Sequence, residues 1–71
     1  MKTIRLRLAE LLDEHKMTRY ELGKRTGISY QTLTRYYKNK TSSYESDTLL
    51  KICTALDCGI EELIEIKDEA F

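Results

Sequence analysis

The sequence predicts an all-α fold of five short helices. Apolar residues recur at intervals of three and four through most of the chain, which is the period of an amphipathic helix. Serine, threonine, glycine and asparagine, which favour helix ends, separate these apolar segments. The 71 residues can bury one small core, so we expect a single domain over residues 1–71. A chain this short also makes self-association worth expecting.

The first helix is predicted over residues 5–15. Its apolar stripe consists of Ile4, Leu8, Leu11 and Leu12. The beginning of this helix stays open, because apolar residues alternate with Arg5 and Arg7 over the first few positions, a pattern that is typical of an extended strand.

A second helix is predicted to begin after Thr18. Thr18 and Glu21 form a capping box, in which the threonine side chain accepts a hydrogen bond from the Glu21 amide and the glutamate reaches back to the Thr18 amide. The helix carries Leu22 inward. It should end near Thr26, because Gly27 can adopt the left-handed conformation that closes a helix.

A third helix follows almost at once. Ser29 is its predicted cap, Leu33 and Tyr36 form its inner face, and Asn39 is expected to end it in the left-handed conformation. Only two residues separate the preceding glycine from this helix, so it must cross the second helix steeply. The sequence therefore predicts a helix-turn-helix motif over about residues 18–39.

The last third of the chain contains two more predicted helices. A polar loop over residues 40–46 precedes the fourth helix, which Ser46 or Asp47 would cap. The apolar stripe of the fourth helix consists of Leu49, Ile52, Cys53 and Leu56. The apolar positions of the fifth are Ile60, Leu63 and Ile64. Residues 64–67 then alternate between apolar and charged, so the two chain ends could pair as short strands.

Cys53, Cys58 and His15 do not predict a metal site or a catalytic site. The C-x4-C spacing lacks a second pair of ligands, so two structural thiols are favoured over a ligand pair. His15 stands alone at a predicted helix end and is expected to be solvated. No nucleophile with a base and no phosphate-cradling loop can be identified, so we expect neither enzymatic activity nor a cofactor.

The charges are segregated along the chain, although they sum to zero. Residues 16–40 contain seven lysines and arginines against one glutamate, a net charge of +6, whereas residues 41–71 contain two lysines against eight acidic residues, a net charge of −6. Exposed charges are screened within about 8 Å at physiological salt, so the basic block can attract a polyanion whatever the total charge. The sequence therefore favours a nucleic-acid partner for the middle of the chain.

The sequence contains no apolar run long enough to span a membrane, and its beginning lacks the neutral core of a signal peptide. We therefore expect a cytoplasmic protein with no membrane partner.

Residues 19–36 resemble the helix-turn-helix core of the phage-repressor family, the Xre/Cro group of small DNA-binding regulators. The matching positions are Leu22, Gly23, Gly27, Ile28, Leu33 and Tyr36. Residues 46–65, SDTLLKICTALDCGIEELIE, are similar to the fourth and fifth helices of that family. The resemblance implies a compact five-helix, lambda-repressor-like domain. The chain departs from the family at Gly23, where alanine is more common, at Thr26, a position that is usually more apolar, and at Asn39, where glycine is usual.

The resemblance places the N-terminal part of the third helix in the major groove of duplex DNA. The implied base contacts are Tyr30, Gln31, Thr34 and Arg35. Gln31 could pair with adenine and Arg35 with guanine, each through two hydrogen bonds. Arg19 matches the position at which the family clamps a phosphate. The other implied phosphate contacts are Ser29, Lys38, Lys40, Thr41, Ser43 and Tyr44.

Ordinary surface or packing roles compete with these contacts. Gln31 and Arg35 could be exposed side chains with no specific partner, and Lys24 and Arg25 are expected to form a solvated helix face. Tyr37 could either cover the fourth helix or contact a phosphate.

We therefore expect a sequence-specific, double-stranded DNA-binding transcriptional regulator, and more specifically a repressor. The alternative is a protein-interaction module on the same fold, such as an antitoxin or anti-repressor subunit, whose acidic C-terminal third holds a protein partner. One recognition helix covers only a half-site, so a homodimer is expected. Its predicted interface consists of Ile60, Leu63, Ile64 and Ile66, and residues 4–8 could join it.

Overall fold

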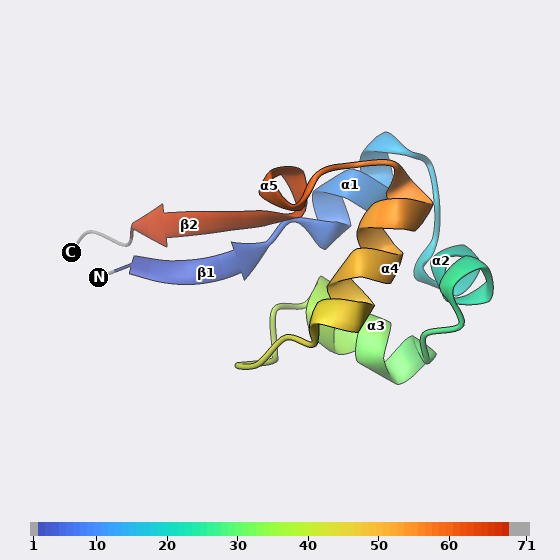
Figure 1. Cartoon of the computed structure of the whole chain (residues 1–71), viewed down its shortest axis with the longest axis horizontal. Coiled ribbons are helices and arrows are strands. Elements are labelled where there is room, and N and C mark those ends of the chain that lie inside the picture. The colour runs from blue at the N-terminus through green and yellow to red at the C-terminus, as the bar shows by residue number, and fades with distance from the viewer. Residues whose placement is uncertain (1, 69–71) are drawn as a thin grey trace.

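The computed structural model describes residues 2–68, and within them it has five helices and one two-stranded antiparallel sheet. The elements, in chain order, are β1 (Lys2–Leu6), α1 (Leu8–Glu14), α2 (Arg19–Thr26), α3 (Tyr30–Tyr37), α4 (Ser46–Leu56), α5 (Ile60–Leu63) and β2 (Ile64–Asp68). The helices pack together, and the two strands form a ribbon that extends away from them (Figure 1). The predicted helical fold with short terminal strands is confirmed.

The first helix begins later than predicted, because residues 2–6 form a strand. The alternating residues of β1 pair with those of β2, so that Leu6 lies opposite Ile64 and Ile4 lies opposite Ile66. Ile4 is consequently 56% exposed, and its placement in the stripe of the first helix is wrong. The alternative reading of these residues as extended is confirmed.

The helix-turn-helix forms as its caps predict. The Glu21 amide donates to the Thr18 hydroxyl (3.1 Å) and the Thr18 amide donates to the Glu21 carboxylate (3.3 Å), which completes the capping box of α2. Gly27 ends α2 with a φ of 77°. Ser29 caps α3 by accepting a hydrogen bond from the Thr32 amide (3.2 Å).

Gly23 marks the closest approach between α2 and the chain that follows it. A Cβ atom at this position would lie 3.2 Å from the carbonyl oxygen of Ile28 and 3.4 Å from Cδ1 of Leu33. A methyl group at this position would therefore press against the carbonyl oxygen of the turn and would just touch Leu33 of α3.

Asn39, two residues after the end of α3, connects that helix to the ribbon. Asn39 adopts the left-handed conformation with a φ of 57°, as expected. Its side chain also accepts a hydrogen bond from the Leu6 amide (2.7 Å) and donates one to the Leu6 carbonyl (3.1 Å). We call this pair of hydrogen bonds the Asn39 latch, because it joins β1 to the end of α3.

The beginning of α4 differs from the sequence-based expectation. The N-cap residue is Glu45, and no side chain caps this helix, so the predicted Ser46 or Asp47 cap is wrong. The Glu45 amide instead donates to the hydroxyl of Tyr36 (3.2 Å), so the end of α3 holds the start of α4. The helix closes at Asp57, which has a φ of 50°.

The core lies between the five helices and the base of the ribbon. Its buried residues are Leu6, Leu8, Leu11, Leu12, Leu22, Leu33, Tyr36, Ile52, Leu56 and Leu63. Leu63 is completely buried, which removes it from the predicted dimer surface. Within the described residues, no helix is long and apolar enough to cross a membrane.

Candidate nucleic-acid interface

The exposed face of α3 gathers the polar side chains that the sequence assigns to base contacts. Leu33 and Tyr36 point into the core, and the opposite side of the helix faces solvent. A shallow surface hollow of about 600 Å³ lies on this side. It is lined by Tyr30, Gln31, Thr32, Thr34 and Arg35. All four predicted base-contacting residues thus line one surface of one helix.

Arg19 reaches from the start of α2 onto this surface. Its guanidinium donates to the Thr34 hydroxyl (Nη1 to Oγ1, 3.2 Å), and its Cζ atom lies 5.2 Å from the ring centroid of Tyr30 and 4.5 Å from that of Tyr37. A cation over an aromatic face is stabilised by the ring quadrupole. The guanidinium is therefore positioned by two rings and a hydroxyl beside the recognition face.

Tyr37 has a role that the sequence did not indicate. It is half-buried and lines a hollow with residues of α1, of α2 and of the connection between them, including Leu12, Arg19 and Met17. Its ring also stacks over the guanidinium of Arg19, and the two roles that the sequence left open, covering the fourth helix or contacting a phosphate, stay predictions. The sequence could have indicated this orientation, because Tyr37 directly follows the core residue Tyr36 and neighbouring residues of a helix point in different directions.

Thr32 is a second residue that sequence reasoning missed. Its hydroxyl accepts a hydrogen bond from the Ser29 hydroxyl (2.9 Å) and one from the Arg35 guanidinium (Nη2, 3.5 Å). Thr32 thus connects the cap of α3 to one of the predicted base-reading side chains. Its position three residues after the cap and three before the arginine could have predicted this contact.

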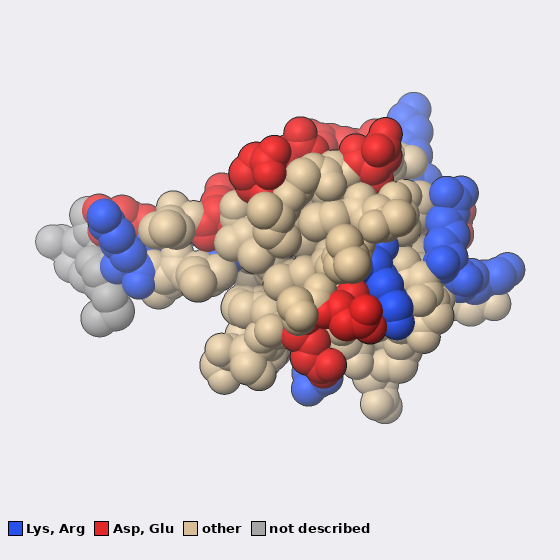
Figure 2. Space-filling view, in the orientation of Figure 1, with Lys and Arg blue, Asp and Glu red and all other residues tan. Residues whose placement is uncertain are grey.

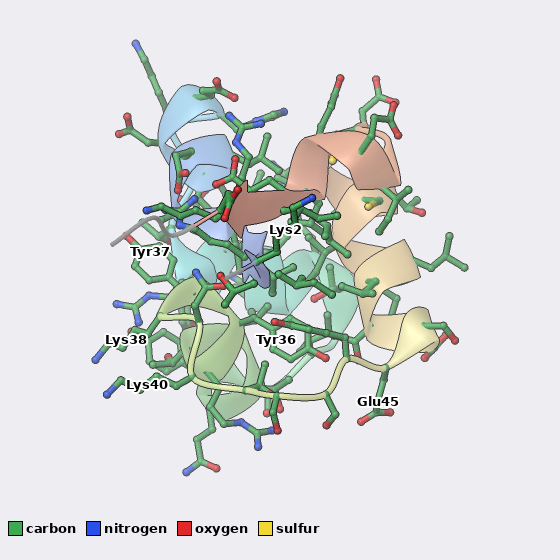
Figure 3. All side chains as sticks on the ribbon, turned by 90° about the vertical axis from the view of Figure 1, so that its left-hand side faces the viewer. Lys2, Tyr36, Tyr37, Lys38, Lys40 and Glu45 are labelled. Carbon is green, nitrogen blue, oxygen red and sulfur yellow. The ribbon has the colours of Figure 1, made fainter. Side chains whose placement is uncertain are left out.

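The predicted phosphate contacts fall into separate groups. Lys38 and Lys40 project on the side of Tyr37, away from the interior position of Tyr36 (Figure 3). In the loop that follows, the Thr41 hydroxyl donates to the Ser43 carbonyl (2.8 Å). The Tyr44 ring packs edge-on against the buried Tyr36, with 5.7 Å between the ring centroids.

Opposite charges occupy different parts of the surface. Figure 2 shows acidic side chains along the edge above α5 and α1, and basic side chains at the end where α2 lies. The ion pairs that the described residues form involve Arg5 and Lys51, and none includes a lysine or arginine of residues 16–40. The basic block therefore keeps its charges available for an external anion.

The predicted dimer residues do not form one surface. Leu63 is in the core, and Ile64 is half-buried at the base of the ribbon. Ile60 is 49% exposed and lines an apolar hollow with Leu50 and other residues of α4, whereas Ile66 is 71% exposed on the ribbon. The structure thus separates the predicted interface into an α4–α5 hollow and a ribbon face.

Both cysteines are free thiols, and both are half-buried. Burial and the neighbouring Cys53 thiol raise the pKa of Cys58 to about 11, so its thiol stays protonated at neutral pH. The described residues contain no cluster of three or more histidine, cysteine or acidic side chains that could hold a metal ion. The Cys58 amide donates to the Cys53 carbonyl (3.0 Å), a backbone hydrogen bond at the C-terminal end of α4.

Comparison with known proteins agrees with the helix-turn-helix arrangement of α2 and α3. The sequence profile of the Cro/C1-type helix-turn-helix DNA-binding domain matches residues 7–69. The chain therefore belongs to the Cro/C1-type helix-turn-helix family of DNA-binding domains. No curated protein matches its sequence significantly.

Two solved structures are similar over nearly the whole chain. A candidate DNA-binding protein from Bacteroides fragilis is 27% identical with a TM-score of 0.79, over 89% of this chain and 100% of that protein. The transcriptional regulator VanUg is 28% identical with a TM-score of 0.76, over 96% of this chain and 89% of that one. Together with the family match, these similarities identify a helix-turn-helix DNA-binding domain that spans nearly the whole chain.

Proposed function

We propose that this protein is a sequence-specific repressor that binds duplex DNA through α3 and blocks transcription by occupying its operator. The observation that carries the proposal is the exposed face of α3, where four residues able to contact bases surround one hollow. Arg19 lies directly beside them. This arrangement matches the geometry of helix-turn-helix proteins, in which the second helix of the motif enters the major groove.

Base reading is assigned to the first two turns of α3. Gln31 can contact adenine and Arg35 can contact guanine, each through two hydrogen bonds. Tyr30 and Thr34 would pack on thymine methyl groups or contact the backbone next to the bases. Arg35 is exposed, and among the described residues its side chain holds a long hydrogen bond to Thr32 (3.5 Å), which it can exchange for a base at little cost.

Phosphate contacts are assigned to the cations and hydroxyls around α3. Arg19 is the central residue of this group, because its guanidinium is fixed beside the recognition face. The remaining members are Ser29, Lys38, Lys40, Thr41, Ser43 and Tyr44. Phosphate contacts fix the register of a protein on DNA and supply affinity that does not depend on sequence.

We further propose that the protein acts in the cytoplasm as a homodimer and has no enzymatic activity. A single recognition helix reads one half-site, so two copies on half-sites about 34 Å apart would supply the affinity that operator binding needs. The similarity to the regulator VanUg supports a role in transcription.

The test is selection of bound sequences from random duplex DNA, followed by titration of the selected site and a scrambled one. We expect a palindromic site with a conserved spacing, bound at least about 10³-fold more tightly than the scrambled site at physiological salt. Equal affinity for both would contradict sequence-specific recognition.

A protein-interaction module remains the second candidate, because acidic side chains gather along one edge of the molecule (Figure 2). That role requires no DNA affinity. A protein without measurable, salt-dependent DNA binding would favour this candidate over the repressor.

A further inference from the structure

The two cysteines occupy matched positions of the turn that ends α4. Asp57 is left-handed (φ 50°), its amide donates to the Thr54 carbonyl (3.3 Å), and the Cys58 amide donates to the Cys53 carbonyl (3.0 Å). These two nested hydrogen bonds make up the Schellman motif. In that motif the side chains of the residues that form the outer bond commonly contact each other, and here both of those residues are cysteines.

The outer hydrogen bond also limits the distance between the two cysteines. With 3.0 Å between the amide nitrogen and the carbonyl oxygen, standard bond lengths keep the two Cα atoms within about 7 Å of each other. Disulfides usually join Cα atoms that are about 4.4–6.8 Å apart. Both cysteines are half-buried, and both line the hollow between α4 and α5. A disulfide between them therefore needs little or no backbone movement.

We propose that Cys53 and Cys58 form a dithiol that small disulfides such as glutathione disulfide oxidise reversibly to an intramolecular disulfide. One cysteine thiolate attacks a sulfur of glutathione disulfide and releases one glutathione thiolate. The second cysteine thiolate then attacks the cysteine sulfur of this mixed disulfide and releases the other glutathione thiolate. The two released thiolates take up the two protons that the cysteines lost. The chain is oxidised by two electrons, and the oxidant is reduced to two glutathione thiols.

Oxidation would reinforce the joint between α4 and α5. Only Cys58 and Gly59 separate the left-handed Asp57 from the first residue of α5. The left-handed position of this motif usually holds glycine, and a residue with a side chain adopts that conformation less readily. A covalent bond across the turn restricts the unfolded chain and so favours the folded turn.

The dithiol lies apart from the proposed recognition face. Its hollow is lined by residues of α4, of α5 and of the turn between them, whereas the hollow on the recognition helix is lined by residues of α3 alone. Oxidation should therefore leave operator affinity unchanged. The inference goes beyond the proposed function and does not depend on it, because a chain without DNA affinity would still form the disulfide.

The protonation of Cys58 affects the rate of the reaction. Burial, the Cys53 thiol and the carboxylates of Glu62 and Glu61 raise the pKa of Cys58 to about 11. Because the thiolate is the form that attacks a disulfide, oxidation should be slow at neutral pH and faster as the pH rises towards that value. Equilibration therefore calls for hours at about pH 8.

The test is equilibration of the whole chain with mixtures of reduced and oxidised glutathione, followed by acid quenching and mass measurement. We expect the main oxidised product to have lost two hydrogen atoms and to carry no glutathione. The equilibrium constant for oxidation should be at least about tenfold larger in the folded chain than in the same chain unfolded in urea. This follows from linkage, because a bond that stabilises the fold is itself stabilised by folding. The oxidised chain should also melt at a higher temperature than the reduced chain.

The double variant C53S/T54C is the matched control, because it moves the first thiol by one position. Thr54 is exposed and lines a different hollow, beside Arg25 and Thr26. The shifted pair should therefore be oxidised no more readily in the folded chain than in urea. Circular dichroism verifies that the variant is folded.

Two results would overturn the dithiol. One is a wild-type equilibrium constant that is no larger in the folded chain than in urea. The other is the same preference for the folded chain in C53S/T54C, which would show that the Schellman positions are not what pairs the thiols. If the double variant does not fold, the comparison of the folded and unfolded wild type still decides.

Discussion

Arg35 and Gln31 lie one helical turn apart on the exposed face of α3, so each would meet a different base of the same half-site. A good bidentate contact contributes about 1–3 kcal/mol of discrimination between bases. Replacing Arg35 with alanine should therefore relax the preference for guanine at one position per half-site, and Gln31→Ala should do the same for a neighbouring adenine. The measurement is binding to a panel of single-base operator variants.

Leu33 provides the contrast for these two substitutions. It is completely buried between α2 and α3, so Leu33→Ala should lower the free energy of unfolding by about 2–5 kcal/mol and reduce binding to every operator variant alike. A folded Arg35→Ala protein with an unaltered base preference would show that α3 does not read DNA in this way.

Arg19 should behave differently, because a phosphate carries no sequence information. Arg19→Ala is expected to weaken binding to operator DNA and to random DNA by the same factor. It should also make the slope of log affinity against log salt concentration shallower by about one unit. Fluorescence anisotropy at several salt concentrations measures both quantities. Selective loss of operator affinity would instead assign Arg19 to the bases.

Tyr37 allows the position of Arg19 to be tested separately from its charge. Its ring lies 4.5 Å from the guanidinium carbon, and Tyr37→Phe retains that ring, whereas Tyr37→Leu removes it. We expect the phenylalanine variant to match the wild type in DNA affinity and the leucine variant to resemble Arg19→Ala. Equal affinities for the leucine and phenylalanine variants would mean that the ring does not position Arg19.

At the scale of secondary-structure elements, the Asn39 latch joins the ribbon to the recognition helix. Asn39→Gly keeps a residue suited to the left-handed conformation but removes both hydrogen bonds to Leu6. A typical net contribution is about 0.5–1.5 kcal/mol per hydrogen bond, so this variant should be less stable by about 1–3 kcal/mol in urea unfolding. If the glycine variant were as stable as the wild type, Asn39 would contribute through its left-handed backbone conformation and not through its hydrogen bonds to Leu6.

A second connection between elements predicts a dependence on pH. Arg5 of β1 contacts Glu10 of α1 (2.7 Å), and this hydrogen bond lowers the pKa of the Glu10 carboxyl. A carboxyl whose pKa is lowered by folding stabilises the fold above its unfolded pKa, and the contribution is lost as the pH falls through the folded pKa. Glu10→Gln should therefore unfold with a weaker acid dependence than the wild type in thermal melts below about pH 5. Identical acid dependence would show that this pair contributes nothing.

For the whole molecule, the separation of charges matters more than their sum. The net charge is zero, yet residues 16–40 carry +6 with no ion pair among the described residues to neutralise them. Because a polyanion binds the nearest basic surface, we propose that DNA affinity falls steeply as salt rises, although the protein as a whole is neutral. The basic and acidic parts of one small domain would then face DNA and solvent, respectively.

The sequence by itself determined the parts of this protein whose causes are local. The capping box at Thr18, the left-handed Gly27 and the cap at Ser29 each depend on residues within four positions, so the helix-turn-helix could be placed from sequence with little error. The same local periodicity identified Leu33 and Tyr36 as core residues and, by exclusion, the exposed face of α3.

The tertiary structure decided what depends on contacts between distant residues. Whether residues 2–6 belong to a helix or form a strand depends on β2, about sixty positions away, because Ile4 fits both a helical stripe and a strand alternation. The sequence placed Leu63 in a dimer interface, whereas the fold buries it in the core. The side chain of Asn39 forms a hydrogen bond with the backbone of Leu6, which is 33 residues away. The guanidinium of Arg19 in α2 likewise lies over the rings of Tyr30 and Tyr37 only because α2 and α3 pack against each other. Local capping signals placed the starts of α2 and α3. Burial, side-chain partners and the starts of α1 and α4 depend instead on how the elements pack in three dimensions.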